Sequence, residues 1–203
     1  MKEIILLGGG GHARSCIDVI ESTKEYKIMG IIDPLASSED FIYEVFKKEE
    51  SISDLRRTVE LGLVTVGQQK SPETRLKLFN ELIELDYQLP AIISENAYKS
   101  QDSFLDKGSI MMHMSVLNSG SKIGKNCILN TKSLIEHDSA VGDHCHIATG
   151  AIVNGGVQVG DRTFIGSNSV IAPGIHIGDD CFIGAGILVH KDVEEGSIIK
   201  FKQ

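Results

Sequence analysis

Aliphatic side chains recur every six residues through the second half of the chain. From residue 102 to residue 191 the sequence divides into fifteen consecutive hexads with no insertion, and the fourth place of every hexad is aliphatic or methionine. A period of six fits neither the 3.6-residue repeat of an α-helix nor the two-residue repeat of an ordinary strand. It fits a coil with flat sides, in which each hexad forms one side.

A second period gives the number of sides. Gly124, Gly142, Gly160 and Gly178 lie eighteen residues apart, and a charged residue follows each of them. One turn therefore takes three hexads, and the glycines stack at one corner, where a Cβ would crowd the backbone. The pattern predicts a parallel β-helix of about five coils over residues 102–191, with the aliphatic column filling its interior.

The first half of the chain alternates between strand and helix patterns. Strands are predicted at residues 3–7, 27–32, 63–66 and 89–93, and helices at 12–22 and 72–85, whereas residues 35–60 give no clear pattern. This order predicts an α/β, Rossmann-like N-terminal domain over residues 1–95, followed by the β-helix domain over residues 96–203.

A glycine-rich turn follows the first predicted strand. Gly8, Gly10 and Ala13 satisfy G-x-G-x-x-A, and Asp33 follows the second strand. Such a turn holds a pyrophosphate on the N–H groups of a helix start, while the acid reaches a ribose or a base. The motif fits NAD, a nucleotide-diphosphate sugar, or a turn with only a structural role. A single short β-α-β unit argues against a full dinucleotide site.

Composition narrows the class of partner. The formal net charge of −8 without a basic stripe argues against nucleic-acid binding. No apolar run approaches the roughly 20 residues that span a bilayer, and the start of the chain lacks the pattern of a signal peptide. We therefore expect a cytoplasmic protein with no membrane partner. The cysteines form no CxxC pair, and we expect reduced thiols, three of which stack as small core side chains: Cys127, Cys145 and Cys181.

One histidine stands out as candidate chemistry. His137 lies at a predicted corner of the coil, between Glu136 and Asp138. A neighbouring carboxylate fixes the tautomer of an imidazole and favours the proton once it is taken, which suits a general base. The glycine turn at residues 154–156 stacks one coil further on, where an exposed N–H could hold an oxyanion. A surface histidine without a role is the alternative.

Two stretches resemble a known family. The glycine turn reads GGGGHA, and residues 129–156 read LNTKSLIEHDSAVGDHCHIATGAIVNGG. Both resemble the bacterial sugar acetyltransferases of the NeuD/PglD type, and the similarity covers nearly the whole chain. The resemblance implies a left-handed β-helix, acetyl-CoA as co-substrate, no metal, and a homotrimer with the coenzyme between neighbouring helices.

The same resemblance implies roles for single residues. His137 would be the general base and Asp138 its orienting acid. His146 would line the acetyl-CoA site, and the Gly155 N–H would meet the thioester oxygen. The acceptor would be held by Asn130 at its sugar and, at its nucleotide, by Gly10, Gly11, His12 and Asp33.

Two departures from the family pattern concern the ligand sites. The chain ends in GSIIKFKQ instead of a G-x-P-A-[KR] segment, and the turn Gly67-Gln68-Gln69 lacks the Asp or Asn often found after its glycine. The favoured activity is acetylation of the 4-amino group of a UDP- or GDP-linked sugar.

Three other functions stay open at this point. They are O-acetylation of a sialic acid or a related nonulosonic acid, sugar-nucleotide binding without catalysis, and a γ-carbonic-anhydrase-like zinc site. The zinc site is disfavoured because it uses a close histidine pair separated by four residues, and no such pair occurs in this sequence. The tightest pair here, His144 and His146, lies on alternate residues of a strand.

Overall fold

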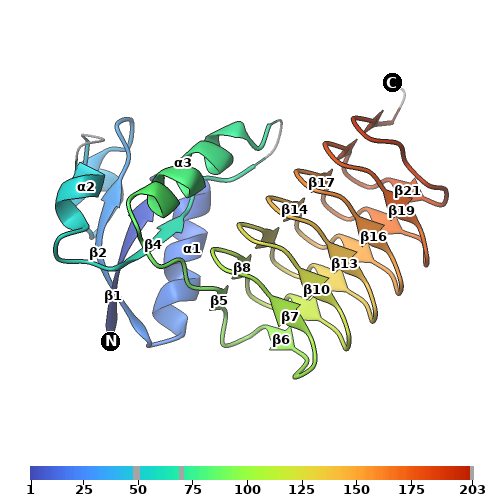
Figure 1. The fold of residues 1–203 in the computed structure, drawn as a ribbon, viewed down its shortest axis with the longest axis horizontal. Coiled ribbons are helices and arrows are strands. Elements are labelled where there is room, and N and C mark those ends of the chain that lie inside the picture. The colour runs from blue at the N-terminus through green and yellow to red at the C-terminus, as the bar shows by residue number, and fades with distance from the viewer. Residues whose placement is uncertain (48–50, 69–70, 202–203) are drawn as a thin grey trace.

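A computed structural model describes residues 1–47, 51–68 and 71–201. The N-terminal region, blue to cyan-green in Figure 1, lies beside the first coils of a long β-helix. Its elements are β1 (Lys2–Leu7), α1 (Gly11–Ser22), β2 (Tyr26–Ile32), a 3₁₀ turn (Ser38–Asp40), β3 (Val45–Phe46), α2 (Ser51–Leu55), β4 (Leu61–Val64) and α3 (Glu73–Glu84).

The strands of this region form one parallel sheet in the order β3-β2-β1-β4. Alternate residues of β1 point to opposite faces of the sheet. Ile4 and Leu6 pack with α1, whereas Ile5 and Leu7 pack with Leu82 of α3 and with α2. The α1 face continues into the β-helix, because Ile128 of β11 belongs to the same core as Ile4 and Leu6. The N-terminal region is therefore fixed to the β-helix by a shared apolar core.

In the described part of the chain, three parallel sheets make the three sides of the coil. The five-stranded side holds β7 (Phe104–Leu105), β10 (Lys122–Ile123), β13 (Ala140–Val141), β16 (Gln158–Val159) and β19 (His176–Ile177). The seven-stranded side holds β5 (Ile92–Ile93), β8 (Ile110–Met111), β11 (Ile128–Leu129), β14 (His146–Ile147), β17 (Phe164–Ile165), β20 (Phe182–Ile183) and β22 (Ile198–Ile199). The six-stranded side holds β6 (Tyr98–Lys99), β9 (Val116–Leu117), β12 (Leu134–Ile135), β15 (Ile152–Val153), β18 (Val170–Ile171) and β21 (Leu188–Val189).

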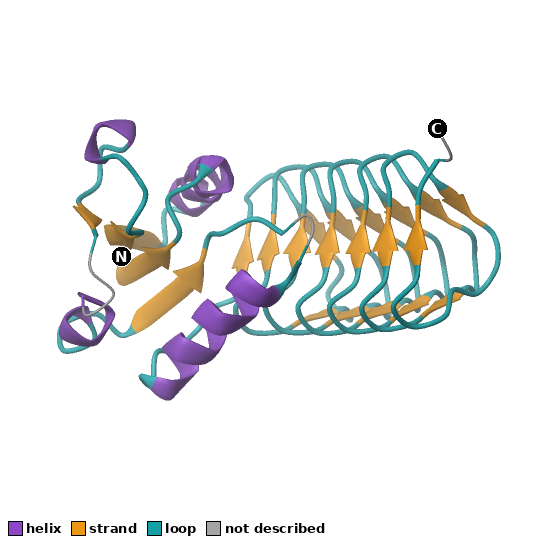
Figure 2. Ribbon diagram, turned by 90° about the horizontal axis from the view of Figure 1, so that it is seen from above, coloured by secondary structure: helices purple, strands orange, loops and turns teal. Residues whose placement is uncertain are grey.

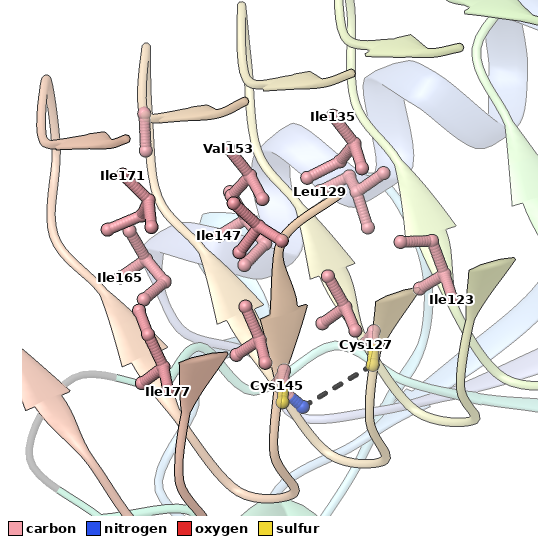
Figure 3. Close-up of a cluster of buried hydrophobic side chains, with 14 of the residues drawn as sticks. Ile123, Cys127, Leu129, Ile135, Cys145, Ile147, Val153, Ile165, Ile171 and Ile177 are labelled. Carbon is pink, nitrogen blue, oxygen red and sulfur yellow. Dashed lines mark hydrogen bonds between the residues drawn. The ribbon is translucent and has the colours of Figure 1, made fainter. Parts of the chain in front are cut away.

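The interior confirms the six-residue pattern. Every fourth-place side chain from Leu105 to Val189 is at most 8% exposed, and Figure 3 shows part of this column. Strands pair in a register of eighteen residues, as in Lys122 with Ala140, so the coils stack evenly, as Figure 2 shows. The corner glycines are needed for space, because a Cβ on Gly142 would lie 2.9 Å from the backbone nitrogen of Asp161 in the next coil.

The coil is longer than its sequence pattern predicted. It begins at β5 and ends at β22, which adds strands on both sides of residues 102–191. The pattern missed the start because Lys99 occupies a fourth place, where an aliphatic residue is expected. Its ammonium donates to the carbonyl oxygens of Ser103, at 2.6 Å, and Ser100, at 3.2 Å. A lysine can stand at this place because backbone oxygens of the first coils satisfy its charge.

The three stacked cysteines are buried and free, as expected of small core side chains. Each thiol donates to a carbonyl oxygen of the next coil, as Cys127 Sγ does to Gly142 O at 3.1 Å and Cys145 Sγ to Gly160 O at 3.1 Å. The thiols thus satisfy backbone oxygens inside the coil. Among the described residues, no helix has the length and apolar character that a membrane crossing needs.

Candidate functional site

The predicted base lies at an exposed corner of the β-helix. His137 follows β12 and Asp138 precedes β13, and a φ of +60° at Asp138 turns the chain at this point. His137 Nδ1 lies 2.9 Å from Asp138 Oδ2, so Nδ1 carries the proton and Nε2 keeps its lone pair. Glu136 does not share this role, because its Oε2 accepts from Asn118 Nδ2 at 2.9 Å.

Gly155 of the next coil lies directly against the imidazole. A Cβ at this position would be 2.6 Å from His137 Nε2, so only glycine leaves the ring this close. The neighbouring Gly156 N–H donates to His137 O at 3.0 Å and is therefore used by the ladder. Within the described residues, the Gly155 N–H has no hydrogen-bond partner. A basic nitrogen and a free backbone donor thus lie side by side.

The hydrogen bond that His137 donates to the Asp138 carboxylate raises the pKa of His137 above its ordinary value of 6.5. Slight burial opposes this effect, and the charges of Asp138 and Glu136 add to it. His137 is therefore a stronger base than a free imidazole, and it needs a higher pH to be neutral.

The glycine turn has one open half. Gly8 has a φ of +112° and packs against Val66, and Gly9 packs against Ala36. By contrast, nothing lies within 4 Å of a Cβ built on Gly10 or Gly11. Since α1 begins at Gly11 with no acidic residue in its first turn, its exposed start can receive an anion.

Asp33 acts on this turn from the end of β2. Its Oδ2 accepts from Gly9 N at 2.7 Å, and its Oδ1 accepts from Leu35 N at 2.8 Å and Ala36 N at 3.2 Å. The sequence predicted that this carboxylate reaches a ribose or a base. In the structure this carboxylate accepts hydrogen bonds from two turns of the backbone. Its first contribution to ligand binding is therefore to fix the shape of the loop.

A cavity of about 550 Å³ opens beside Asp33. It lies at the carboxyl ends of β1, β2 and β4, where ligands bind in open α/β sheets. Its lining is mainly apolar, with Leu7, Leu35 and Val66. Charges come from Asp33 and, on α3, from Glu73, Lys77 and Glu81. The size and lining suit a flat heterocycle with a few polar edges.

A second group of predicted residues meets where the glycine turn faces the seven-stranded side. His146 Nδ1 donates to Gln68 O at 2.6 Å, and Asn130 Nδ2 donates to His146 Nε2 at 3.1 Å. The rings of His12 and His146 lie 6.4 Å apart. His12, Asn130 and His146 therefore form one group, which we call the acceptor cluster after the role that the sequence predicts for His12 and Asn130. Both ring nitrogens of His146 are engaged within the protein. That His146 lines the acetyl-CoA site stays a prediction.

The imidazoles of this cluster are neutral. Burial lowers the pKa of His146 to about 3, and burial together with the charge of Arg75 lowers the pKa of His12 to about 4. Cys16 Sγ lies 3.3 Å from His12 Nε2, and burial raises the pKa of this thiol to about 12. Cys16 is therefore a protonated donor to His12 and not a nucleophile.

The base and the acceptor cluster are not brought together within one chain. His137 lies at the corner between the six-stranded and five-stranded sides. His146 points outward from the seven-stranded side, which is opposite that corner in a three-sided coil. The predicted site residues thus form two groups on opposite parts of the β-helix.

Sequence reasoning missed Arg75 and the carbonyl of Gln68. Arg75 is 1% exposed, although it lies in the first turn of α3, where an arginine is expected to face solvent. Gln69, the last residue of the turn that departs from the family pattern, lies outside the described residues. Within residues 1–47, 51–68 and 71–201, no three His, Cys, Asp or Glu side chains converge as a metal ion would require.

Two family models match the chain. Residues 3–82 match the PglD N-terminal domain, and residues 156–191 match the hexapeptide repeat of succinyl-transferase. Among solved structures, PerB from Caulobacter crescentus, in complex with CoA and GDP-perosamine, is 27% identical with a TM-score of 0.89, covering 98% of this chain and 93% of that one. The chain thus combines a PglD N-terminal domain with hexapeptide repeats, resembles the NeuD/PglD type, and is a sugar acetyltransferase.

Other solved structures are similar over nearly the whole chain. A histidine-to-asparagine variant of perosamine N-acetyltransferase from Caulobacter crescentus, with CoA and GDP-perosamine, is 26% identical with a TM-score of 0.87, covering 98% of this chain and 91% of that one. The acetyltransferase domain of PglB from Neisseria gonorrhoeae, with acetyl coenzyme A, is 22% identical with a TM-score of 0.91, covering 97% and 95%. This last likeness confirms the fold: an α/β region followed by a left-handed parallel β-helix. No curated protein sequence matches this acetyltransferase significantly.

Proposed function

We propose that the chain transfers the acetyl group of acetyl-CoA to the 4-amino group of a UDP- or GDP-linked sugar. The observation that carries the proposal is the pair of His137 Nε2, free to take a proton, and the unpartnered Gly155 N–H beside it. The similarity of the chain to PerB, which was crystallised with CoA and GDP-perosamine, supports acetyl-CoA and a nucleotide-linked amino sugar as the two substrates. We also propose that the enzyme acts in the cytoplasm, as expected from the sequence.

The reaction needs no covalent enzyme intermediate. The acceptor amine attacks the thioester carbon while His137 Nε2 takes the proton that the nitrogen loses. Negative charge then develops on the thioester oxygen, to which the Gly155 N–H donates. The tetrahedral intermediate expels the CoA thiolate, which takes the proton from the imidazolium. General-base help contributes ~10²–10⁴-fold and one oxyanion donor ~10²–10³-fold.

The acceptor occupies the N-terminal region in this proposal. Its pyrophosphate binds the exposed start of α1 at Gly10 and Gly11, and its base enters the cavity beside Asp33. The sugar then extends toward Asn130, whose amide is oriented by the buried His146. His12 lies between the glycine turn and this amide. The geometry supports one continuous path from base to sugar.

The active site is completed by a second copy of the chain. The base corner and the acceptor cluster lie on opposite parts of one β-helix, so the amine of an acceptor bound to one copy meets His137 of another. The outward residues of the six-stranded side are apolar and favour such an assembly: Tyr98, Val116, Leu134, Ile152, Val170 and Leu188. We propose a homotrimer, in agreement with the family resemblance.

A thiol-release screen tests the reaction. Acetyl-CoA is offered with UDP-linked amino sugars, GDP-linked amino sugars and sialic acids, and free CoA thiol is measured. The proposal expects turnover with one of the nucleotide-linked amino sugars and none with its N-acetylated form. Turnover only with a sialic acid would instead establish O-acetylation, and acetyl-CoA hydrolysis without a preferred acceptor would contradict the acceptor site.

A further inference from the structure

A single arginine is enclosed between the two parts of the molecule. Arg75, in the first turn of α3, is 1% exposed and is the largest fully buried side chain of the described residues. Within that part of the chain, its guanidinium donates only to the carbonyl oxygens of Val64, Val66 and Asn126 and to Asn126 Oδ1. Burial lowers the pKa of Arg75 to about 10, so the group stays charged at neutral pH.

A buried cation without a carboxylate partner is costly, which suggests a task beyond packing. The arginine holds the carbonyls of Val64, at 3.2 Å, and Val66, at 2.6 Å, on one nitrogen, Nη1. These residues begin the loop that leaves β4. The other terminal nitrogen of the guanidinium, Nη2, donates to the β-helix, at 3.1 Å to Asn126 O and at 2.7 Å to Asn126 Oδ1. The loop is therefore fixed relative to the β-helix by one planar group.

The same loop controls the acceptor cluster. Two residues after Val66, the carbonyl of Gln68 accepts from His146 Nδ1 at 2.6 Å. This bond places the proton on Nδ1 and leaves Nε2 to accept from Asn130 Nδ2 at 3.1 Å. If the carbonyl of Gln68 moved, His146 could take its other tautomer, and Asn130 would lose the acceptor that orients its amide.

We infer that Arg75 is a positioning residue for the acceptor site, which fixes the loop from Val64 to Gln68 and through it the tautomer of His146. Its planar fork spans the loop and the β-helix together, which a single ammonium cannot do. The role of Asn130 toward the sugar rests on the proposed function, whereas the link from Arg75 to His146 does not.

Substitution of Arg75 tests the link in the full chain. In Arg75→Gln labelled with ¹⁵N-histidine, the His146 nitrogen resonances should move from the single Nδ1–H tautomer toward a mixture of both. The acceptor KM should rise by about tenfold, the size expected for one misplaced hydrogen bond, while the acetyl-CoA KM stays within about twofold. Arg75→Lys should give an intermediate shift, and it decides the test if Arg75→Gln does not fold.

Asn126→Gly is the matched control. It removes the bond from Arg75 Nη2 to Asn126 Oδ1 and the bonds of Asn126 Nδ2 to Arg75 O and His144 Nδ1. The bonds of the Arg75 guanidinium to Val64 O, Val66 O and Asn126 O are kept, and the φ of +54° at this position suits glycine. It should lower the melting temperature and leave the His146 resonances unchanged. The inference is overturned if folded Arg75→Gln or Arg75→Lys leaves these resonances unchanged, or if Asn126→Gly shifts them equally. Absence of turnover with any acceptor would contradict only the proposed function.

Discussion

At the scale of single residues, the two nitrogens of His137 have different tasks. Nδ1 is tied to Asp138, and Nε2 faces Gly155. The carboxylate does not need to accept the proton from Nδ1 in the reaction. In the proposed reaction it would hold the tautomer and stabilise the imidazolium while the acceptor proton resides on the ring. This arrangement separates orientation from proton transfer.

The pH dependence of the rate should reveal this carboxylate. Because Asp138 raises the pKa of His137, the rate should rise with pH around a value above 6.5, measured with an acceptor whose amine does not titrate in that range. Asp138→Asn removes the main cause of the shift and should move the midpoint to lower pH while lowering kcat. Steady-state profiles of kcat for both proteins check this. An unchanged midpoint in Asp138→Asn would contradict the pairing.

The buried histidines of the acceptor cluster predict acid sensitivity. Below pH 6.5 the unfolded chain gains protons on His12 and His146, whereas the folded chain does not until about pH 4 and about pH 3. The free energy of unfolding should therefore fall as pH is lowered from about 6.5 to about 4, by up to about 1.4 kcal/mol per pH unit for each histidine. Denaturant unfolding of the wild type and of His146→Gln measures the two slopes. Equal slopes would show that His146 takes up its proton in the folded state.

At the scale of elements, substitutions at the start of α1 can separate an effect on ligand binding from an effect on stability. A Cβ added at Gly11 would meet open space, and alanine is a better helix former than glycine. Gly11→Ala should therefore keep the melting temperature but raise the acceptor KM by at least about tenfold, because the methyl group occupies the place of a pyrophosphate. An unchanged acceptor KM would remove the pyrophosphate from this turn.

Gly9→Ala is the comparison variant for Gly11→Ala, because Gly9 is enclosed by neighbouring side chains. Its Cβ would lie 2.6 Å from the Cβ of Ala36, so this variant should lose about 1–3 kcal/mol of stability by overpacking. Thermal unfolding of both variants, beside the acceptor KM of Gly11→Ala, distinguishes a ligand-binding glycine from a packing glycine.

The periodic parts of the fold could be predicted from the sequence, because burial in a regular coil repeats with the residue number. The corner that carries His137, Asp138 and Gly155 was located in the same way, since residues eighteen apart stack. Positions that break the period were missed. Lys99 fills an aliphatic place because carbonyl oxygens satisfy its charge, and this bonding has no sequence pattern.

Contacts between distant segments also escaped prediction. Arg75 lies in an amphipathic helix, where pattern reasoning assigns arginine to the surface. The bond from His146 to Gln68 uses a backbone oxygen, which any residue type supplies. Asp33 was predicted as a ligand residue, but its carboxylate binds three backbone N–H groups, since the same residue type suits both tasks. The sequence therefore predicts the buried column and the stacking of its corners better than the contacts of the acceptor cluster.

At the scale of the whole molecule, the apolar six-stranded side predicts assembly. Ile152 lies in the middle of this side and is half-buried in the single chain. The wild type should have a mass near three times 22.1 kDa by light scattering. Ile152→Lys places a charge in the proposed interface and should yield monomers with little activity. Asn80→Lys, which adds the same charge on exposed α3, should stay assembled and active. A wild-type monomer with full activity would contradict the shared site.

The central claim is that His137 takes the proton from a nucleotide-linked amino sugar as acetyl-CoA is attacked. The most direct test is the steady-state kcat of His137→Ala with the acceptor found by the thiol-release screen. We expect kcat to fall by ~10²-fold or more, while the melting temperature and the affinity for acetyl-CoA stay unchanged, because an exposed corner side chain is not part of the aliphatic column. A folded variant with near-normal kcat would show that His137 is not the general base.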